Sequence, residues 1–76
     1  MSSKLTLFHT DGCHLCDEAQ ALLDDMGLAY QLVDICEQTV WLERYRIRIP
    51  VLTLGGSELG WPFDKDMVSA FLESVK

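Results

Sequence analysis

The chain has 76 residues, of which 49% are hydrophobic and 24% are charged. This length and composition predict one globular domain over residues 1–76, with too little chain for a second core. Twelve acidic residues against six basic ones give a net charge of −6, which argues against nucleic acid or anionic lipid as a partner.

The first predicted element is a strand at residues 4–9, because its apolar residues become continuous, as in a strand covered on both faces. A helix is predicted from Leu15 to Met26, where apolar residues recur at helical spacing before Gly27. Residues 28–35 are rich in Val, Ile, Leu and Tyr and predict a second strand. A right-handed crossover would make the two strands parallel.

The second half of the chain predicts a short helix followed by a hairpin. Residues 38–45 carry apolar side chains at helical spacing. Pro50 then requires an extended or turned backbone at Ile49. Strands are predicted at 51–54 and 57–60, since the two glycines between them suit a tight antiparallel turn.

A last helix is predicted to begin after Asp64, which is a good N-cap residue. Phe63 precedes this cap and Val68 occupies the fourth helical position, the arrangement of a hydrophobic staple. The buried face of this helix is expected to consist of Met67, Val68, Phe71, Leu72 and Val75.

Nothing in the sequence predicts export or a membrane span. No apolar stretch reaches the ~20 residues that a spanning helix needs, and residues 5–8 are too short for the apolar region of a signal peptide. Three cysteines are also too few for the disulfide framework of a small secreted domain. We therefore expect a cytoplasmic, monomeric protein.

A Cys-x-x-Cys motif, Cys13 to Cys16, lies between the first strand and the first helix. Together with the segment 49–51 before the third strand and the glycine pair of the hairpin, it resembles the glutaredoxin-like branch of the thioredoxin superfamily. The resemblance covers essentially the whole chain. It implies an α/β fold of order β-α-β-α-β-β-α, with a four-stranded mixed sheet flanked by three helices, and thiol-disulfide oxidoreductase activity.

The position of the motif assigns different roles to the two cysteines. A thiolate is the species that attacks a disulfide, and a helix N-terminus stabilises an anion. Cys13, at the first turn, is therefore the expected nucleophile, and Cys16, three residues deeper, is the expected resolving thiol. His14 would favour a Cys13 thiolate when protonated. Three nearby acidic residues would oppose this effect of His14 and suggest that the protein is a moderate reductant. They are Asp11, Asp17 and Glu18.

The resemblance also implies a substrate groove. In the family, a cis-proline stands where this chain has Pro50 and presents the backbone of the residue before it to an extended thiol peptide. The expected substrate-binding residues are Ile49, Pro50, Val51, Trp61 and Asp64. A disulfide-bearing protein or a small-molecule thiol is the expected substrate, with no cofactor. Glutathione stays open as a co-substrate, because Thr10 stands where glutathione-using relatives usually have a lysine.

Two alternatives compete with redox chemistry. Cys13, Cys16, Cys36 and a histidine, His9 or His14, would supply the four ligands of a zinc module. A thioredoxin-fold interaction module without catalysis would instead hold a partner at Pro50 and Trp61.

Other residues are expected to have plainer roles. Cys36 is expected to be an inert, partly buried thiol on the same rim as Cys13. His9 is expected to pack at the end of its strand. The arginines at 44, 46 and 48 are expected to form a solvated helix end.

Overall fold

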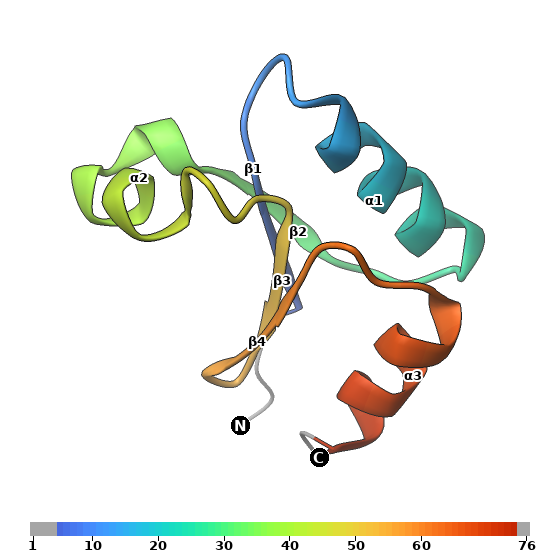
Figure 1. Ribbon diagram of the computed structural model, residues 1–76. Coiled ribbons are helices and arrows are strands. Elements are labelled where there is room, and N and C mark those ends of the chain that lie inside the picture. The colour runs from blue at the N-terminus through green and yellow to red at the C-terminus, as the bar shows by residue number, and fades with distance from the viewer. Residues whose placement is uncertain (1–4, 75–76) are drawn as a thin grey trace.

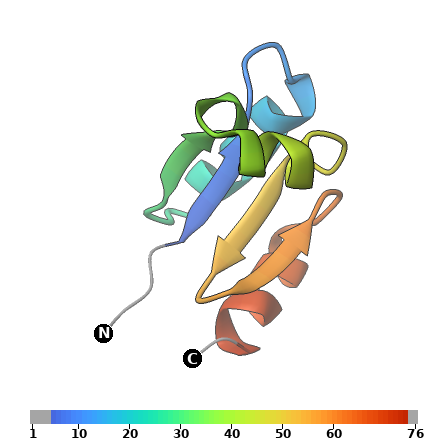
Figure 2. The same cartoon turned by 90° about the vertical axis from the view of Figure 1, so that its left-hand side faces the viewer.

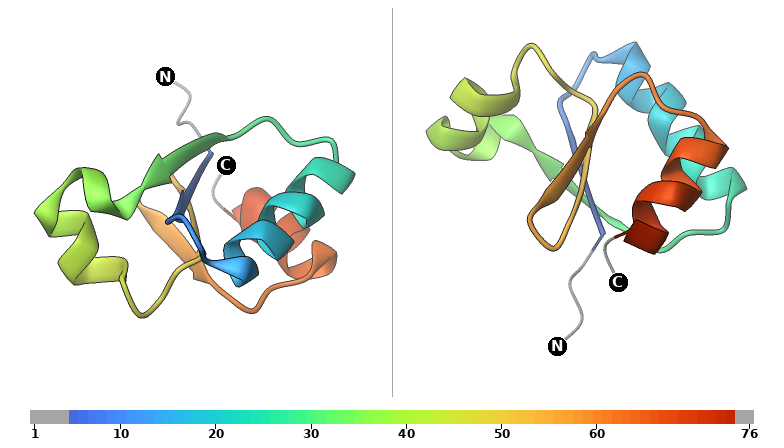
Figure 3. Two further views of the ribbon diagram at one scale, coloured as in Figure 1. Left: turned by 90° about the horizontal axis from the view of Figure 1, so that it is seen from above. Right: turned by 60° about the horizontal axis from the view of Figure 1, so that its bottom comes forward.

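A computed structural model of the chain describes residues 5–74 and has a sheet between two layers of helices (Figure 1). The strands are β1 (Thr6–His9), β2 (Gln31–Asp34), β3 (Val51–Leu54) and β4 (Ser57–Gly60). The helices are α1 (His14–Asp25), α2 (Thr39–Tyr45) and α3 (Lys65–Ser74), with a 3-10 turn η1 at Ile35–Glu37. Helices α1 and α3 cover one face of the sheet, and α2 covers part of the other (Figure 3).

The four strands form one mixed sheet in the order β2-β1-β3-β4 (Figure 2). β1 and β2 are parallel, whereas β3 runs antiparallel to both β1 and β4. The predicted α/β class and element order are therefore confirmed. This topology brings the carboxyl ends of β1 and β2 to the same edge as the beginning of β3, where Val51 pairs with Phe8.

The hairpin between β3 and β4 has the predicted bounds. Its turn residues Gly55 and Gly56 have φ angles of 58° and 88°. Positive φ at both central positions matches the right-handed twist of the strands, and glycine adopts it without steric cost. The local sequence therefore determined this part of the sheet.

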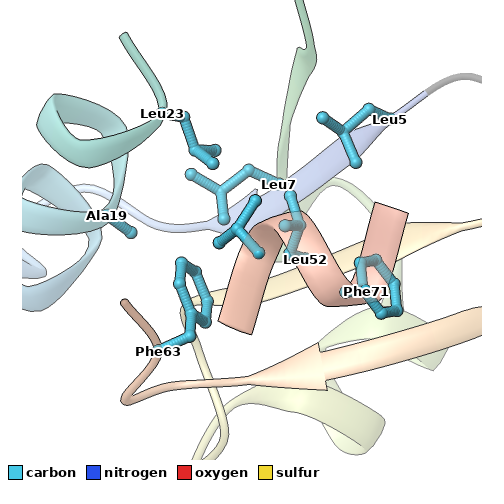
Figure 4. Packing of buried hydrophobic residues seen from close by; sticks show 8 residues of the cluster. Leu5, Leu7, Ala19, Leu23, Leu52, Phe63 and Phe71 are labelled. Carbon is cyan, nitrogen blue, oxygen red and sulfur yellow. The ribbon is translucent and has the colours of Figure 1, made fainter. Parts of the chain in front are cut away.

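Alternation along β1 and β3 divides the core into two clusters. Leu7 and Leu52 face α1 and α3, whereas Phe8 and Val51 face α2. The larger cluster consists of Leu5, Leu7, Ala19, Leu23, Leu52, Phe63, Val68 and Phe71 (Figure 4). The smaller one consists of Phe8, Ile35, Tyr45 and Val51.

The second strand, predicted at residues 28–35, is shorter than expected at both ends. The second strand begins at Gln31 and not at 28, because the N–H of Leu28 donates to the carbonyl of Leu23 and closes the end of α1. It also ends before Ile35, where the Asp34 carboxylate caps η1 by accepting from the Cys36 N–H at 2.9 Å.

The last helix begins as predicted, with Asp64 Oδ1 accepting from the Met67 N–H at 2.8 Å. Val68 and Phe71 are buried. Met67 is 44% exposed and was wrongly assigned to the buried face. It stands in the first turn, beside the cap and directly before buried Val68, so its side chain points away from the sheet. The predicted contributions of Lys4 and Val75 lie outside the described residues.

Candidate active site

Cys13 lies at the N-cap of α1, with φ −90° and ψ 100°. Its sulfur accepts a hydrogen bond from the Cys16 N–H at 3.3 Å, and its carbonyl accepts from the N–H groups of Cys16 and Asp17. The side chain is partly exposed. The sulfur thus meets a backbone N–H of the first helical turn and the positive end of the helix dipole, which both favour a negative charge.

Cys16 has a different environment, although it is only one helical turn away. It is 0% exposed and belongs to the buried face of α1. Burial, followed by the hydrogen bond between its side chain and Cys13, raises the pKa of the Cys16 thiol from 9.0 to about 12. The two thiols are therefore unequal: one reaches solvent, and the other is shielded and protonated.

Thr10 contacts both the Cys-x-x-Cys motif and Cys36, which follows the neighbouring strand β2. These contacts were not predicted from the sequence. The Thr10 backbone hydrogen-bonds to the Cys16 sulfur and acts against the rise in pKa. Its hydroxyl lies 3.5 Å from the sulfur of Cys36. Its position at the end of β1, beside the parallel strand β2, was the signal that could have identified it.

Cys36 lies on the expected rim, but it is exposed and not partly buried. The reason is η1, which turns Ile35 into the core and leaves the next side chain in solvent. Within residues 5–74, no three His, Cys, Asp or Glu side chains converge closely enough to hold a metal ion. The geometry therefore gives no support to the zinc alternative.

The His14 side chain pairs with a carboxylate of its own helix. Its Nε2 lies 3.1 Å from Glu18 Oε2, one turn along α1, and its side chain is 83% exposed. Asp11 and Asp17 are also exposed. The charged groups around the motif are thus solvated, and the influence of His14 on Cys13 stays a prediction.

The segment before β3 lies at the same edge of the sheet as the motif. The Ile49–Pro50 peptide bond is cis, as the family resemblance implies, and Pro50 and Val51 are buried. The Ile49 N–H already donates to the carbonyl of Tyr45 at 3.0 Å. Of the two backbone polar groups of Ile49, the carbonyl makes no hydrogen bond with another described residue. It is therefore the group of Ile49 that is open to a new hydrogen bond.

The remaining predicted groove residues divide into two groups. Trp61 lies beside Pro50, because its N–H donates to the Pro50 carbonyl at 3.2 Å, and its ring packs edge-on against Phe63 at 5.0 Å. The Trp61–Pro62 bond is also cis, which the sequence did not predict. Asp64 instead caps α3, so its carboxylate is already engaged.

No helix within residues 5–74 is long and apolar enough to cross a membrane. This agrees with the expectation from the hydropathy of the sequence.

The family comparison matches residues 4–73 to the glutaredoxin-like domain model, DUF836. The crystal structure of protein XcR50 from X. campestris is 38% identical, with a TM-score of 0.86, and the match covers 95% of this chain and 99% of XcR50. Protein Ne2328 from Nitrosomonas europaea is 27% identical, with a TM-score of 0.78 and coverage of 93% and 92%.

A more distant match agrees with these in fold alone. The holo form of glutaredoxin C1 from Populus tremula x tremuloides has a TM-score of 0.60 at 21% identity, and the match covers 95% of this chain and 76% of that protein.

Proposed function

Because the chain belongs to the glutaredoxin-like domain family, DUF836, we propose that it is a thiol-disulfide oxidoreductase that works by dithiol exchange between Cys13 and Cys16. The observation that carries this proposal is the inequality of the two thiols. Cys13 is partly exposed at a helix N-terminus, and Cys16 is buried beneath it. An attacking thiol must reach its substrate, whereas a resolving thiol needs to reach only its neighbour.

The proposed reaction has two exchange steps. The Cys13 thiolate attacks one sulfur of the substrate disulfide, and the substrate S–S bond breaks to give a mixed disulfide and a leaving thiolate. Cys16 then attacks the Cys13 sulfur while its proton goes to a departing substrate thiolate. The products are a Cys13–Cys16 disulfide and a substrate reduced by two electrons, and an external thiol reductant must restore the dithiol.

The surroundings of Cys16 favour this order. Its high pKa arises partly from the hydrogen bond to Cys13 and from the charge on Cys13. Formation of the mixed disulfide removes the Cys13 thiolate and with it these contributions. The Cys16 thiol would therefore ionise more readily once the substrate is attached to Cys13. Cys16 would become a better nucleophile at the point where its attack on the mixed disulfide is needed.

The surface beside the motif is proposed to bind an extended segment of a disulfide-bearing protein or a small-molecule thiol substrate. Ile49 would contribute its carbonyl and Trp61 would contact the substrate beside it, whereas buried Pro50 and Val51 would act only by positioning the backbone. Asp64 would act only through its place at the start of α3. We propose no resident cofactor, glutathione as an optional co-substrate, and the cytoplasm, where thiols stay reduced, as the location.

A pair of serine substitutions tests the proposal. In a Cys36→Ser background, which removes the third thiol, Cys16→Ser is expected to accumulate a mixed disulfide with bis(2-hydroxyethyl) disulfide. Cys13→Ser is expected to accumulate none and to lose reductase activity. Intact-protein mass spectrometry measures the adduct, which dithiothreitol should release.

The opposite pattern would overturn the assignment. Reductase activity retained in Cys13→Ser, or an adduct located on Cys16 in that variant, would exclude Cys13 as the nucleophile. A protein with all cysteines reduced that binds about one zinc, and loses it in Cys36→Ser, would instead support the metal module.

A further inference from the structure

Three of the chain's six basic residues lie close together in the sequence, shortly before the cis-proline Pro50. Arg44, Arg46 and Arg48 lie within five residues that run from the last turn of α2 towards the cis-proline Pro50. Within residues 5–74, the only other lysine or arginine is Lys65, which pairs with Asp25 at the far side of the molecule from α2. Residues 44–48 are named the arginine segment below.

Two of the three arginines share one carboxylate. Arg44 lies 3.2 Å from Glu58 Oε2, and Arg48 lies 2.9 Å from Glu58 Oε1. Both guanidinium groups lie over the ring of Tyr45, at 5.5 and 5.6 Å from its centroid. Two positive charges against one negative charge leave this cluster positive, and the ring and the carboxylate hold both side chains in place.

The centre of the arginine segment is presented to solvent. Arg46 is exposed and makes no ion pair with another described residue, and Ile47 is 90% exposed. The backbone turns here because the N–H groups of Arg48 and Ile49 both donate to the carbonyl of Tyr45, at 2.7 and 3.0 Å. The result is a fixed turn that displays a cation and an apolar side chain together, a combination typical of protein interfaces.

The arginine segment lies at the same end of the sheet as the start of α1 (Figures 1 and 2). It leads into Val51, which pairs with Phe8 in the strand that runs into the motif. Asp11 in the loop before α1, and Asp17 and Glu18 within α1, are exposed near Cys13 in the sequence. Acidic side chains are therefore exposed around the start of α1, whereas the arginine segment is the only cluster of basic residues within residues 5–74.

From this arrangement we infer that the arginine segment is a docking surface for a disulfide-bearing protein with acidic residues beside its reactive disulfide. The inference rests on the proposed function and specifies its partner. A chain of net charge −6 repels acidic proteins in general. A local positive surface beside the nucleophile would attract such a partner and turn its disulfide towards Cys13.

Matched peptides test the charge preference. Two peptides of equal length carry one cysteine as its 2-pyridyl disulfide, flanked by glutamates in one and by lysines in the other. Release of pyridine-2-thione reports attack by Cys13 in the Cys36→Ser background. At low salt, the acidic peptide is expected to react at least about threefold faster, and the difference should shrink at high salt.

Charge-matched variants locate the preference. Arg46→Gln and Lys65→Gln each remove one positive charge, but only Arg46 belongs to the arginine segment. Arg46→Gln is expected to lower the rate for the acidic peptide more than the rate for uncharged bis(2-hydroxyethyl) disulfide. Lys65→Gln should change neither rate, and Ile47→Ser should slow both peptides.

Equal rates for the two peptides, or equal losses in Arg46→Gln and Lys65→Gln, would overturn the docking surface while leaving the redox proposal intact. A protein that attacks neither the peptides nor the uncharged disulfide would overturn the proposed function, and the docking surface with it.

Discussion

The two faces of the sheet are held to their helices by different interactions. On the face covered by α1 and α3, eight buried residues form one apolar cluster. On the other face, the seven-residue helix α2 contributes to a cluster of four. The second face adds a polar group in which Glu58 Oε2 accepts from the Tyr45 hydroxyl at 2.6 Å.

The two faces therefore contribute to the fold in different ways. Apolar burial on the first face supplies most of the stability, because it scales with the area removed from water. The second face is too small to rely on burial alone. It also holds the arginine segment by directed polar contacts at Glu58, which accepts from the Tyr45 hydroxyl and from the Arg48 guanidinium.

Adjacent residues of β3 give the largest expected effect. Leu52 and Val51 are both 0% exposed and face opposite sides of the sheet. Leu52→Ala should lower the free energy of unfolding by about 2–5 kcal/mol, and Val51→Ala by about 2 kcal/mol, since Val51→Ala removes fewer buried carbon atoms. Urea unfolding measures both, and a greater loss in Val51→Ala would contradict the ranking of the two faces.

Removal of one hydroxyl tests the polar attachment of α2. Tyr45→Phe should lower the free energy of unfolding by about 1–2 kcal/mol, because the Glu58 carboxylate loses its shortest hydrogen bond. Tyr30→Phe is the matched control, since Tyr30 also donates to a carboxylate, Asp24, but on an exposed site. An equal loss of unfolding free energy in the two variants would contradict the idea that the contact with Glu58 is the stronger one.

Acid should weaken the polar contacts of the second face. The hydrogen bond from Tyr45, followed by that from Arg48, lowers the pKa of Glu58 below 4.5. A lowered pKa in the folded state means that Glu58 stabilises the fold above about pH 4.5, and that this contribution disappears as the pH falls through the folded-state pKa. Glu58→Gln should therefore show a flatter acid limb in stability against pH; an unchanged limb would contradict this.

The turn of the hairpin belongs to neither face and gives the smallest expected effect. Gly56 has a φ of 88°, so Gly56→Ala should cost about 1 kcal/mol. Gly60→Ala is the control, because Gly60 lacks a positive φ and an added Cβ would meet no atom within 4 Å. Thermal unfolding of the pair separates backbone strain from the loss of glycine itself, and equal shifts would argue against strain.

Features that depend on neighbouring residues were predictable from the sequence. The glycine pair and the alternation around it determined β3 and β4, and the apolar stripe determined α1. The places of Cys13 and Cys16 follow from their spacing at a helix start, which needs no tertiary contact.

Features that depend on distant contacts were not predictable. The link between Thr10 and Cys36 exists only because β1 and β2 pair in parallel. The arginines were expected to be free in solvent, yet two of them meet Glu58, which reaches them only after the hairpin folds back. A sequence pattern reports spacing along the chain and carries little information about such partners.

The inequality of Cys13 and Cys16 can be measured directly by alkylation of the reduced native protein. Iodoacetamide is added at pH about 8.5, where an unperturbed thiol is half ionised, and peptide mass spectrometry follows each cysteine over time. Exposed Cys36 serves as the internal reference. We expect Cys13 to be modified while Cys16 stays free, because Cys16 is buried with a pKa of about 12. Modification of Cys16 as fast as Cys36 would contradict the assignment of nucleophile and resolving thiol.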